Sequence, residues 1–293
     1  MKQWLLVAGL GLLCSSCEKA INFKLDTTTP SLVVEATIEN DQPPVVILSN
    51  SFSYFSNISA DLLANSFVHN AVITISNGAK THQLKEYSYA SPASLNVYYY
   101  SIDSSNLATA FAGTFNTSYT LNIAVNGKTY NATTTIPLLA KKVDSIWWKK
   151  APNNPDSSKV VLVATVTDPP GYGNYIRYFT KTNSDPFYPG LNSVYDDQIV
   201  DGTTYTTDVE RGVNRNVKLD MNNYSFFDRG DTITLKFANI DKATFDFWRT
   251  MEYSYSSIGN PFASPTKVLS NINGALGYFG GYAAQYKTII VPK

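Results

Sequence analysis

The 293-residue sequence has only two cysteines and two histidines, and only 16% of its residues are charged. So few thiol and imidazole groups exclude most zinc sites and most catalysis by paired cysteine and histidine. Basic and acidic residues both number 23, so the formal net charge is zero. A chain without excess positive charge lacks the general attraction for phosphate on which nucleic-acid binders depend. We therefore expect no nucleic-acid partner.

The usual signatures of hydrolytic enzymes are also missing. No Gly-x-Ser-x-Gly string, which exposes the nucleophile of many serine hydrolases, occurs in the sequence. His69 and His82 flank an expected hairpin and would form only an incomplete zinc site, so we expect both on the surface. The sequence predicts a protein that is not an enzyme and that uses no cofactor.

The amino terminus has the features of an export signal. Lys2 precedes an apolar run, residues 4–13, which is too short to span a bilayer but has the length of a signal-peptide core. Two serines then precede Cys17, and the pattern resembles a bacterial lipoprotein signal, although Cys14 stands where such signals usually carry leucine. The resemblance implies a signal peptide over 1–16 and lipid attachment to Cys17. The alternative is an ordinary signal peptide cut at another bond.

Lipid attachment would make the membrane the first expected partner, because several acyl chains together give effectively permanent anchoring. Residues 17–30 are polar and short and are expected to form the lipidated tether. After cleavage before Cys17 no pair of cysteines remains for an internal disulfide. Stability must then come from the hydrophobic core.

Period-two alternation dominates the first half of the chain. Residues 31–39 place Leu, Val, Ala and Ile on one face and mostly polar residues on the other, which predicts a half-buried strand. Asn77-Gly78 and Asn126-Gly127 lie between similar runs and favour type I′ hairpins. Many short strands at such spacing predict an immunoglobulin-like β-sandwich over residues 31–138.

A second β-rich domain is expected over residues 139–293, because a proline and a Lys-Lys pair interrupt the strand pattern near residue 138. Its best helix signal lies near 241–257, with Asp241 as N-cap and aromatic residues at spacings of three and four. We interpret this stripe as core, the alternative being an aromatic ligand face. The predicted fold class is mainly β, with a sandwich followed by a β-rich domain that carries one amphipathic helix.

Paired aromatic residues are the first candidates for an interaction surface. Neighbours on a strand face opposite sides, so one of Trp147 and Trp148 should point outward. Tyr278 and Phe279 lie in a glycine-rich and aromatic segment, 259–282, which we expect to be a long loop. Long loops in compact domains are usually functional, so this loop is the best interaction candidate.

Asp196, Asp197 and Asp201 form the densest group of acids. Solvated loop acids are the first interpretation of this group. Calcium ligation is the second, because hard oxygen ligands cluster ahead of a glycine. A catalytic pair for glycoside cleavage comes last, since spacing in the sequence does not establish the required separation.

Several short motifs together resemble the Bacteroidota lipoprotein family classed as domain of unknown function 4249. They appear in order along nearly the whole chain after the signal: Leu32-Val-Val-Glu-Ala, Asp168-Pro-Pro-Gly with Asn174-Tyr-Ile-Arg, Asp196-Asp197 with Asp201-Gly202, Asn260-Pro-Phe, and Ser270-Asn-Ile-Asn-Gly. The resemblance implies an outer-membrane lipoprotein, often encoded beside a TonB-dependent transporter. Asp26-Thr27-Thr28 also resembles O-glycosylation sites of this phylum, which makes Thr27 a candidate.

Three functions follow from these observations. The first is an accessory or binding lipoprotein associated with a TonB-dependent barrel and its nutrient, on either face of the outer membrane. The second is a lipoprotein that binds glycans or, less readily, cleaves them. The third is a structural or adhesive lipoprotein. We favour the first, because lipidation and the family resemblance both support it.

Overall fold

A computed structural model describes residues 30–52, 56–91, 95–258, 260, 263–264 and 266–293. Cys17, Thr27, the expected signal peptide and the expected tether up to residue 29 lie outside these residues. Within the described part of the chain, no helix combines the length and the apolar character needed to cross a membrane.

The described residues form a mainly β structure with two sheets and one long helix. About half of the chain, 49%, is strand and 9% is helical, which confirms the predicted fold class. The elements are β1 (Leu32–Glu39), β2 (Val45–Asn50), α2 (Ala60–Ala64), β3 (Val72–Ser76), β4 (Thr81–Ala90), β5 (Asn96–Ile102), η2 (Leu107–Thr109), β6 (Thr117–Val125), β7 (Lys128–Ile136), β8 (Lys142–Lys150), β9 (Lys159–Thr167), β10 (Tyr175–Thr182), β11 (Tyr188–Tyr195), β12 (Thr204–Val209), β13 (Phe227–Asp228), β14 (Thr232–Ile240), α3 (Lys242–Ser257), β15 (Ile272–Asn273) and β16 (Leu276–Ile290).

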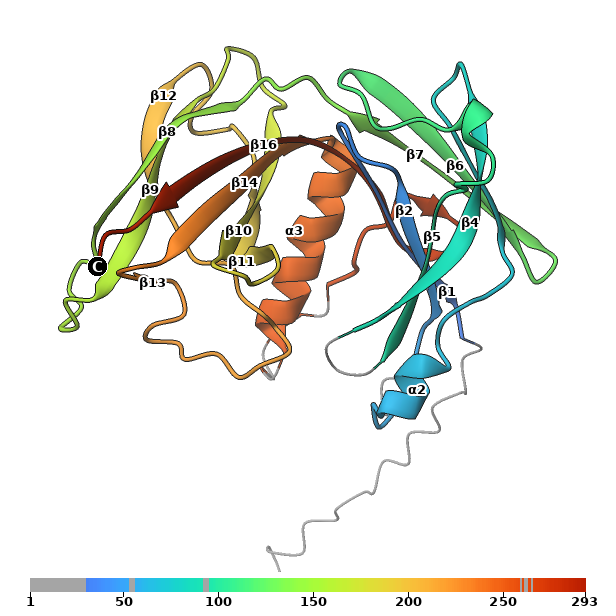
Figure 1. The fold of residues 1–293 in the computed structure, drawn as a ribbon, viewed down its shortest axis with the longest axis horizontal. Coiled ribbons are helices and arrows are strands. Elements are labelled where there is room, and N and C mark those ends of the chain that lie inside the picture. Colours follow the sequence, from blue (N-terminus) through green and yellow to red (C-terminus); the bar gives the residue numbers. More distant parts are fainter. Residues whose placement is uncertain (1–29, 53–55, 92–94, 259, 261–262, 265) are drawn as a thin grey trace, which may run out of the picture.

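The larger sheet runs through both halves of the molecule. Its order is β11-β10-β14-β16-β1-β2-β5-β4-β3-β6-β7-β15. The last long strand, β16, lies between β14 and β1 and pairs with β1 in parallel, whereas the other strand pairs of this sheet are antiparallel. The strands β1 to β7 form a first lobe and the strands β8 to β14 a second lobe. In Figure 1, β16 extends across the centre of the molecule from one lobe to the other.

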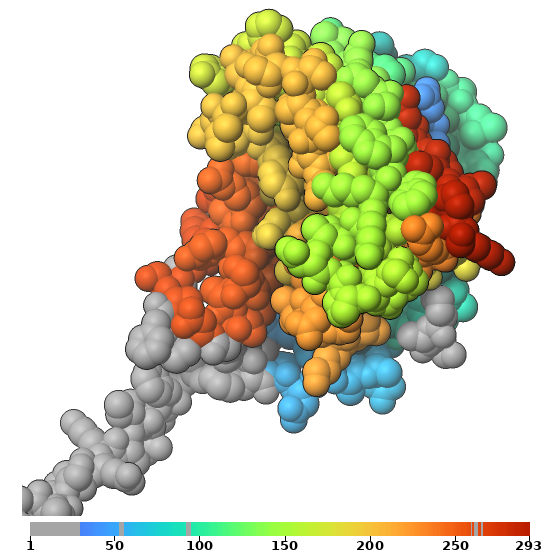
Figure 2. All heavy atoms as spheres, turned by 90° about the vertical axis from the view of Figure 1, so that its left-hand side faces the viewer, coloured from blue at the N-terminus to red at the C-terminus, as the bar shows by residue number. Residues whose placement is uncertain are grey.

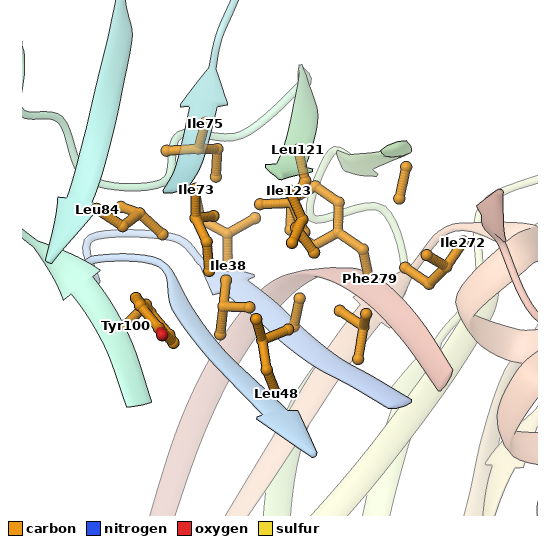
Figure 3. Close-up of a cluster of buried hydrophobic side chains, with 14 of the residues drawn as sticks. Ile38, Leu48, Ile73, Ile75, Leu84, Tyr100, Leu121, Ile123, Ile272 and Phe279 are labelled. Atoms are coloured by element: carbon orange, nitrogen blue, oxygen red, sulfur yellow. The ribbon is translucent and has the colours of Figure 1, made fainter. Parts of the chain in front are cut away.

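The first hydrophobic core lies where this sheet curls over itself. Alternate residues of β1 are buried, as the period-two pattern predicts. They meet side chains of β2, β3 and β6, which point into the space between the strands (Figure 3). Ile272, Phe279 and Ala283 belong to the same core. The expected boundary at residue 138 therefore does not separate the cores, because the end of the chain completes the first one.

The second core forms between the larger sheet and a smaller one, which has the order β12-β9-β13 with β8 also paired to β9. Val160, Leu162, Ala164 and Val166 of β9 face β10 and β14. Figure 2 shows the outer side of this lobe, with the light-green strands β8 and β9 in the middle and orange α3 on the left.

Helix α3 begins and ends close to the predicted residues. The Asp241 side chain accepts a hydrogen bond from the Thr244 amide at 2.8 Å, which confirms it as the N-cap. Phe245 and Phe247 of the helix are buried against β14 and β16. The second carboxylate oxygen of Asp241 accepts hydrogen bonds from Thr134 and Thr135 of β7. The cap therefore also ties the helix to the first lobe.

The two Asn-Gly turns differ from each other. Asn126 and Gly127 both have positive φ, 51° and 72°, between paired Val125 and Lys128, as a type I′ turn requires. At the other hairpin Gly78 has φ 85° but Asn77 is not among the residues with positive φ. The Asn77 amide donates to Lys80 instead, so the tight turn lies one residue later than predicted.

The expectation that both histidines lie on the surface is wrong for His82. His69 is exposed, but His82 is 0% exposed. Its Nε2 accepts the Asp103 amide at 2.9 Å, so Nδ1 carries the proton and faces the Thr109 hydroxyl. Burial lowers the pKa of His82, while nearby Asp103 acts in the opposite direction. The ring is a neutral core residue.

The expectation of a long loop over 259–282 is also wrong, in the second half of that segment. Residues from Leu276 onward belong to β16, and Tyr278 and Phe279 are buried. The segment is rich in glycine because other backbone lies very close: a Cβ on Gly281 would lie 2.4 Å from the Thr135 carbonyl oxygen. Glycine here indicates a crowded strand, and the prediction of an exposed aromatic loop at these two residues was wrong.

Candidate functional site

A recess of about 450 Å³ lies beside α3, on the face of the larger sheet that carries the helix. Strands β1, β10, β14 and β16 form its floor, and α3 forms one wall. We call this site the recess. It is lined by Glu35, Thr37, Glu39, Arg177, Phe179, Phe187, Pro189, Arg215, Lys236, Trp248, Glu252, Tyr255, Tyr278 and Tyr282.

The polar face of β1 supplies one side of the recess. Period-two alternation buries the apolar residues of the strand and leaves Glu35, Thr37 and Glu39 together on the opposite face. Lys236 of β14 forms an ion pair with Glu39, and the Tyr286 hydroxyl donates to the same carboxylate. Glu39 is therefore already engaged.

Arg177 of β10 lies at the centre of the recess and is only 4% exposed. Its guanidinium carbon lies 3.4 Å from the Trp248 ring centre and 4.7 Å from that of Phe179. The same group donates to the Ser193 hydroxyl at 3.1 Å and to the Tyr282 hydroxyl at 3.2 Å. Stacking and hydrogen bonds thus fix the arginine in one position.

Glu252 of α3 is held just as firmly. Its carboxylate accepts hydrogen bonds from the Ser193 amide at 3.0 Å and from the Ser193 hydroxyl at 2.5 Å. Because Ser193 also receives the Arg177 bond, the serine connects the two charged groups. The arrangement joins α3, β10 and β11 through buried polar contacts.

Glu35 is different, because it makes no hydrogen bond or ion pair with any described residue. Its side chain is open to solvent, but the surrounding walls displace much of the water that would hydrate it. This desolvation raises the pKa of the Glu35 carboxyl, and the charge of Arg177 acts in the opposite direction. An accessible carboxylate without a partner is the chemically available group of the recess.

We expect the variant Glu35→Gln to be more stable than the wild type at neutral pH. A folded-state pKa above the unfolded value means that the folded protein loses stability as pH rises through that interval. Glutamine does not ionise, so its advantage should be small at about pH 4 and grow toward about pH 7. Urea unfolding of both proteins at several pH values measures this difference. A variant no more stable than wild type at neutral pH would contradict it.

Three aromatic rings of the recess each have one face covered by another side chain. Arg177 covers Trp248 and Phe179, and Tyr278 stacks on Phe247 with ring centres 4.5 Å apart. Sugar rings usually bind on open aromatic faces. The recess therefore favours a ligand held by hydrogen bonds and charge over one held by stacking.

The other predicted interaction residues lie apart. Trp147 of β8 is 39% exposed, and Trp148 packs on the second core under the Arg229 guanidinium, as the strand alternation predicts for a consecutive pair. Tyr278 lines the recess, whereas Phe279 points into the first core. The structure does not bring these four residues into one surface.

The acidic group is rearranged relative to the prediction. Asp197 and Asp201 come together, but Asp196 turns away and pairs with Arg249 of α3 at 3.4 Å. The third carboxylate is Asp168, and oxygens of Asp168, Asp197 and Asp201 all lie within 4.8 Å of one another.

Sequence reasoning missed Glu35, Arg177 and Asp168 as site residues. For Glu35 a signal existed, since the alternation of β1 already placed three polar residues on one face. Arg177 ends the motif Asn174-Tyr-Ile-Arg that carries part of the family resemblance, but no local pattern predicted its place in the recess. Its partners Ser193, Trp248 and Tyr282 come from three other elements.

Comparison with known proteins agrees with the resemblance found in the motifs. A search of curated proteins finds no match. The model of a protein family described as Domain of unknown function (DUF4249) matches residues 18–288. Because this match spans most of the sequence, the chain belongs to the DUF4249 family.

Proposed function

We propose that this protein is a non-enzymatic, lipid-anchored binding protein of the outer membrane that holds a small polar solute in the recess. The observation that carries the proposal is the accessible, unpaired carboxylate of Glu35 beside the fixed guanidinium of Arg177. The recess volume, about 450 Å³, falls within the range of roughly 300–1,000 Å³ typical of ligand sites.

A binding role fits the recess better than catalysis. Hydrolysis of a glycoside needs two carboxyl groups that are both available to the substrate. Glu39 is taken by Lys236 and Tyr286, and Glu252 is taken by Ser193. Glu35 is left without a second available carboxylate among the residues that line the recess.

The solute should carry a hydrogen-bond donor, above all an amine, directed at Glu35. An ammonium group would pair directly with the Glu35 carboxylate and would replace the hydration lost in the recess. The covered faces of Trp248, Phe179 and Tyr278 disfavour the alternative of glycan stacking. A purely structural or adhesive protein would have no need of such a recess.

A thermal-shift screen tests the solute proposal. The panel contains free amino acids, short peptides, polyamines, and mono- and disaccharides at neutral pH. We expect at least one amine-bearing compound to raise the melting temperature of the wild type, and Glu35→Gln to abolish that rise. Because the variant should itself be more stable at this pH, its lack of response would not reflect unfolding. Trp147→Ala, which changes an exposed residue far from the lining, is the matched control.

Two results would overturn this part of the proposal. One is an equal response of Glu35→Gln and the wild type to the same amine. The other is a panel in which only saccharides act.

The transporter partner is supported by the family resemblance and by the expected lipid at Cys17. We expect a gentle detergent pull-down of the lipidated protein from its native envelope to recover a TonB-dependent barrel in stoichiometric amount, identified by mass spectrometry. The Cys17→Ala variant should be released from the membrane fraction and should no longer co-purify with the barrel. Recovery of the lipoprotein alone would contradict the association, and membrane attachment of Cys17→Ala would contradict the anchor.

A further inference from the structure

Three aspartates from distant parts of the sequence meet at one end of the second lobe. Asp168 directly follows β9, Asp197 lies just after β11, and Asp201 lies in the turn before β12. Their carboxylate oxygens lie within 4.8 Å of one another. We call this group the three-aspartate cluster. None of the three residues lines the recess.

Backbone amides fix two of the carboxylates from one side. The Asn174 amide donates to Asp197 at 2.8 Å, and the Gly171 amide donates to Asp201 at 2.7 Å. Both amides belong to the turn between β9 and β10. These contacts explain the positions of Asp197 and Asp201 without any ligand, so they do not by themselves indicate a site.

The burial of Asp168 points to a ligand independently of these amide contacts. Asp168 is only 2% exposed, and among the described residues its carboxylate makes a buried ion pair with Lys141 but no hydrogen bond of ordinary geometry. A buried carboxylate normally accepts several hydrogen bonds or binds a metal, because its desolvation is costly. An oxygen of this side chain lies in the cluster beside those of Asp197 and Asp201.

A single lysine does not neutralise the negative charge of this cluster. The Lys141 ammonium lies 3.3 Å from one oxygen of Asp168, outside hydrogen-bonding geometry, and has no hydrogen-bond partner itself. The Lys141 backbone is fixed by Asn239, whose side chain both accepts its amide hydrogen and donates to its carbonyl. One ammonium against three carboxylates leaves an excess of two negative charges when all three are ionised.

We propose that the three-aspartate cluster binds a divalent cation, with calcium as the fitting ion. Calcium prefers carboxylate and water oxygens at about 2.3–2.6 Å, so two of its ligands lie up to about 5 Å apart, as the cluster allows. Its two charges match the excess. Bound there, the ion joins the ends of β9 and β11 to the start of β12 and reduces fraying at this end of the second core.

Calorimetric titration of the purified full-length protein in detergent with calcium chloride, after treatment with a chelator, tests the site. Binding of one ion should raise the melting temperature by about 5 °C or more at saturation. Asp201→Asn should weaken binding at least about tenfold, because it removes one charged ligand. Asp196→Asn is the matched control, since this neighbouring acid faces Arg249, and it should bind calcium like the wild type.

A second variant tests the position of the ion beside Asp168. Lys141→Met removes the competing ammonium and should tighten calcium binding, and if this variant folds poorly the comparison of Asp201→Asn with Asp196→Asn still decides. Absence of calcium binding by the wild type would overturn the proposal. Equal binding by Asp201→Asn and Asp196→Asn would also overturn it, as would weaker binding by a folded Lys141→Met. All of these outcomes are independent of the solute screen.

Discussion

Replacing Phe279 with alanine should lower the free energy of unfolding by about 3–5 kcal/mol. The side chain is 0% exposed and lies in the first core. In the sheet, Phe279 is the pairing partner of Ala36 of the adjoining strand β1. Alanine would remove most of a large apolar surface and leave a cavity among residues that β16 holds in place. Urea unfolding followed by tryptophan fluorescence measures the change.

The control for this prediction lies on the same strand. Leu276 is 49% exposed, so Leu276→Ala should cost less than about 1 kcal/mol. If Phe279→Ala were equally mild, Phe279 would not be a core residue and would lie in an exposed loop, as the sequence alone predicts.

Gly277→Ala should be more disruptive than an alanine at another left-handed glycine. Gly277 has φ 96°, and a Cβ there would lie 1.9 Å from the Val34 carbonyl oxygen in the adjoining strand. The left-handed backbone alone makes alanine at such a position destabilising by about 1–2 kcal/mol. Here it must also push β1 and β16 apart. We expect more than twice that cost, or failure to fold, measured by chemical denaturation.

Gly127→Ala separates the two causes. Gly127 has φ 72° in the hairpin turn, and nothing lies within 4 Å of the Cβ that alanine would add. This variant should show the backbone cost without the clash. Equal destabilisation by the two substitutions would mean that β1 and β16 can move apart at little cost in stability.

Local patterns predicted much of the fold. Alternation located β1 and its buried face, and Asn126-Gly127 gave the correct turn because the flanking residues pair directly. Asp241 identified the start of α3, since an N-cap depends only on the next few residues. These features are set by neighbours in sequence, so a single sequence contains them.

The failures share a physical cause. The stretch from Tyr278 to Ala284 is buried on both faces, so the alternation of a half-exposed strand is absent there. Gly281 in this stretch and Gly277 just before it resemble loop residues, but they reflect contact with Thr135 and Val34, which lie far away in the sequence. His82 was misplaced for a similar reason, because its partner Thr109 lies in a separate segment.

The sites were harder to predict than the fold. Asp197 and Asp201 were found because they are close in sequence, but Asp168 joins them only through the pairing of β9 with β12. Glu35 and Arg177 likewise meet only because β1 and β10 belong to the same sheet. Sites assembled across strands require the topology, which residue types alone do not specify.

The central position of β16 governs the order in which the protein can be completed. A ribosome makes β1 early and β16 last, yet the two strands lie side by side, and the first core needs Phe279 and Ala283. Pairing over such a distance in the sequence makes folding slow. The emerging chain therefore keeps its first sheet open until β16 has been made.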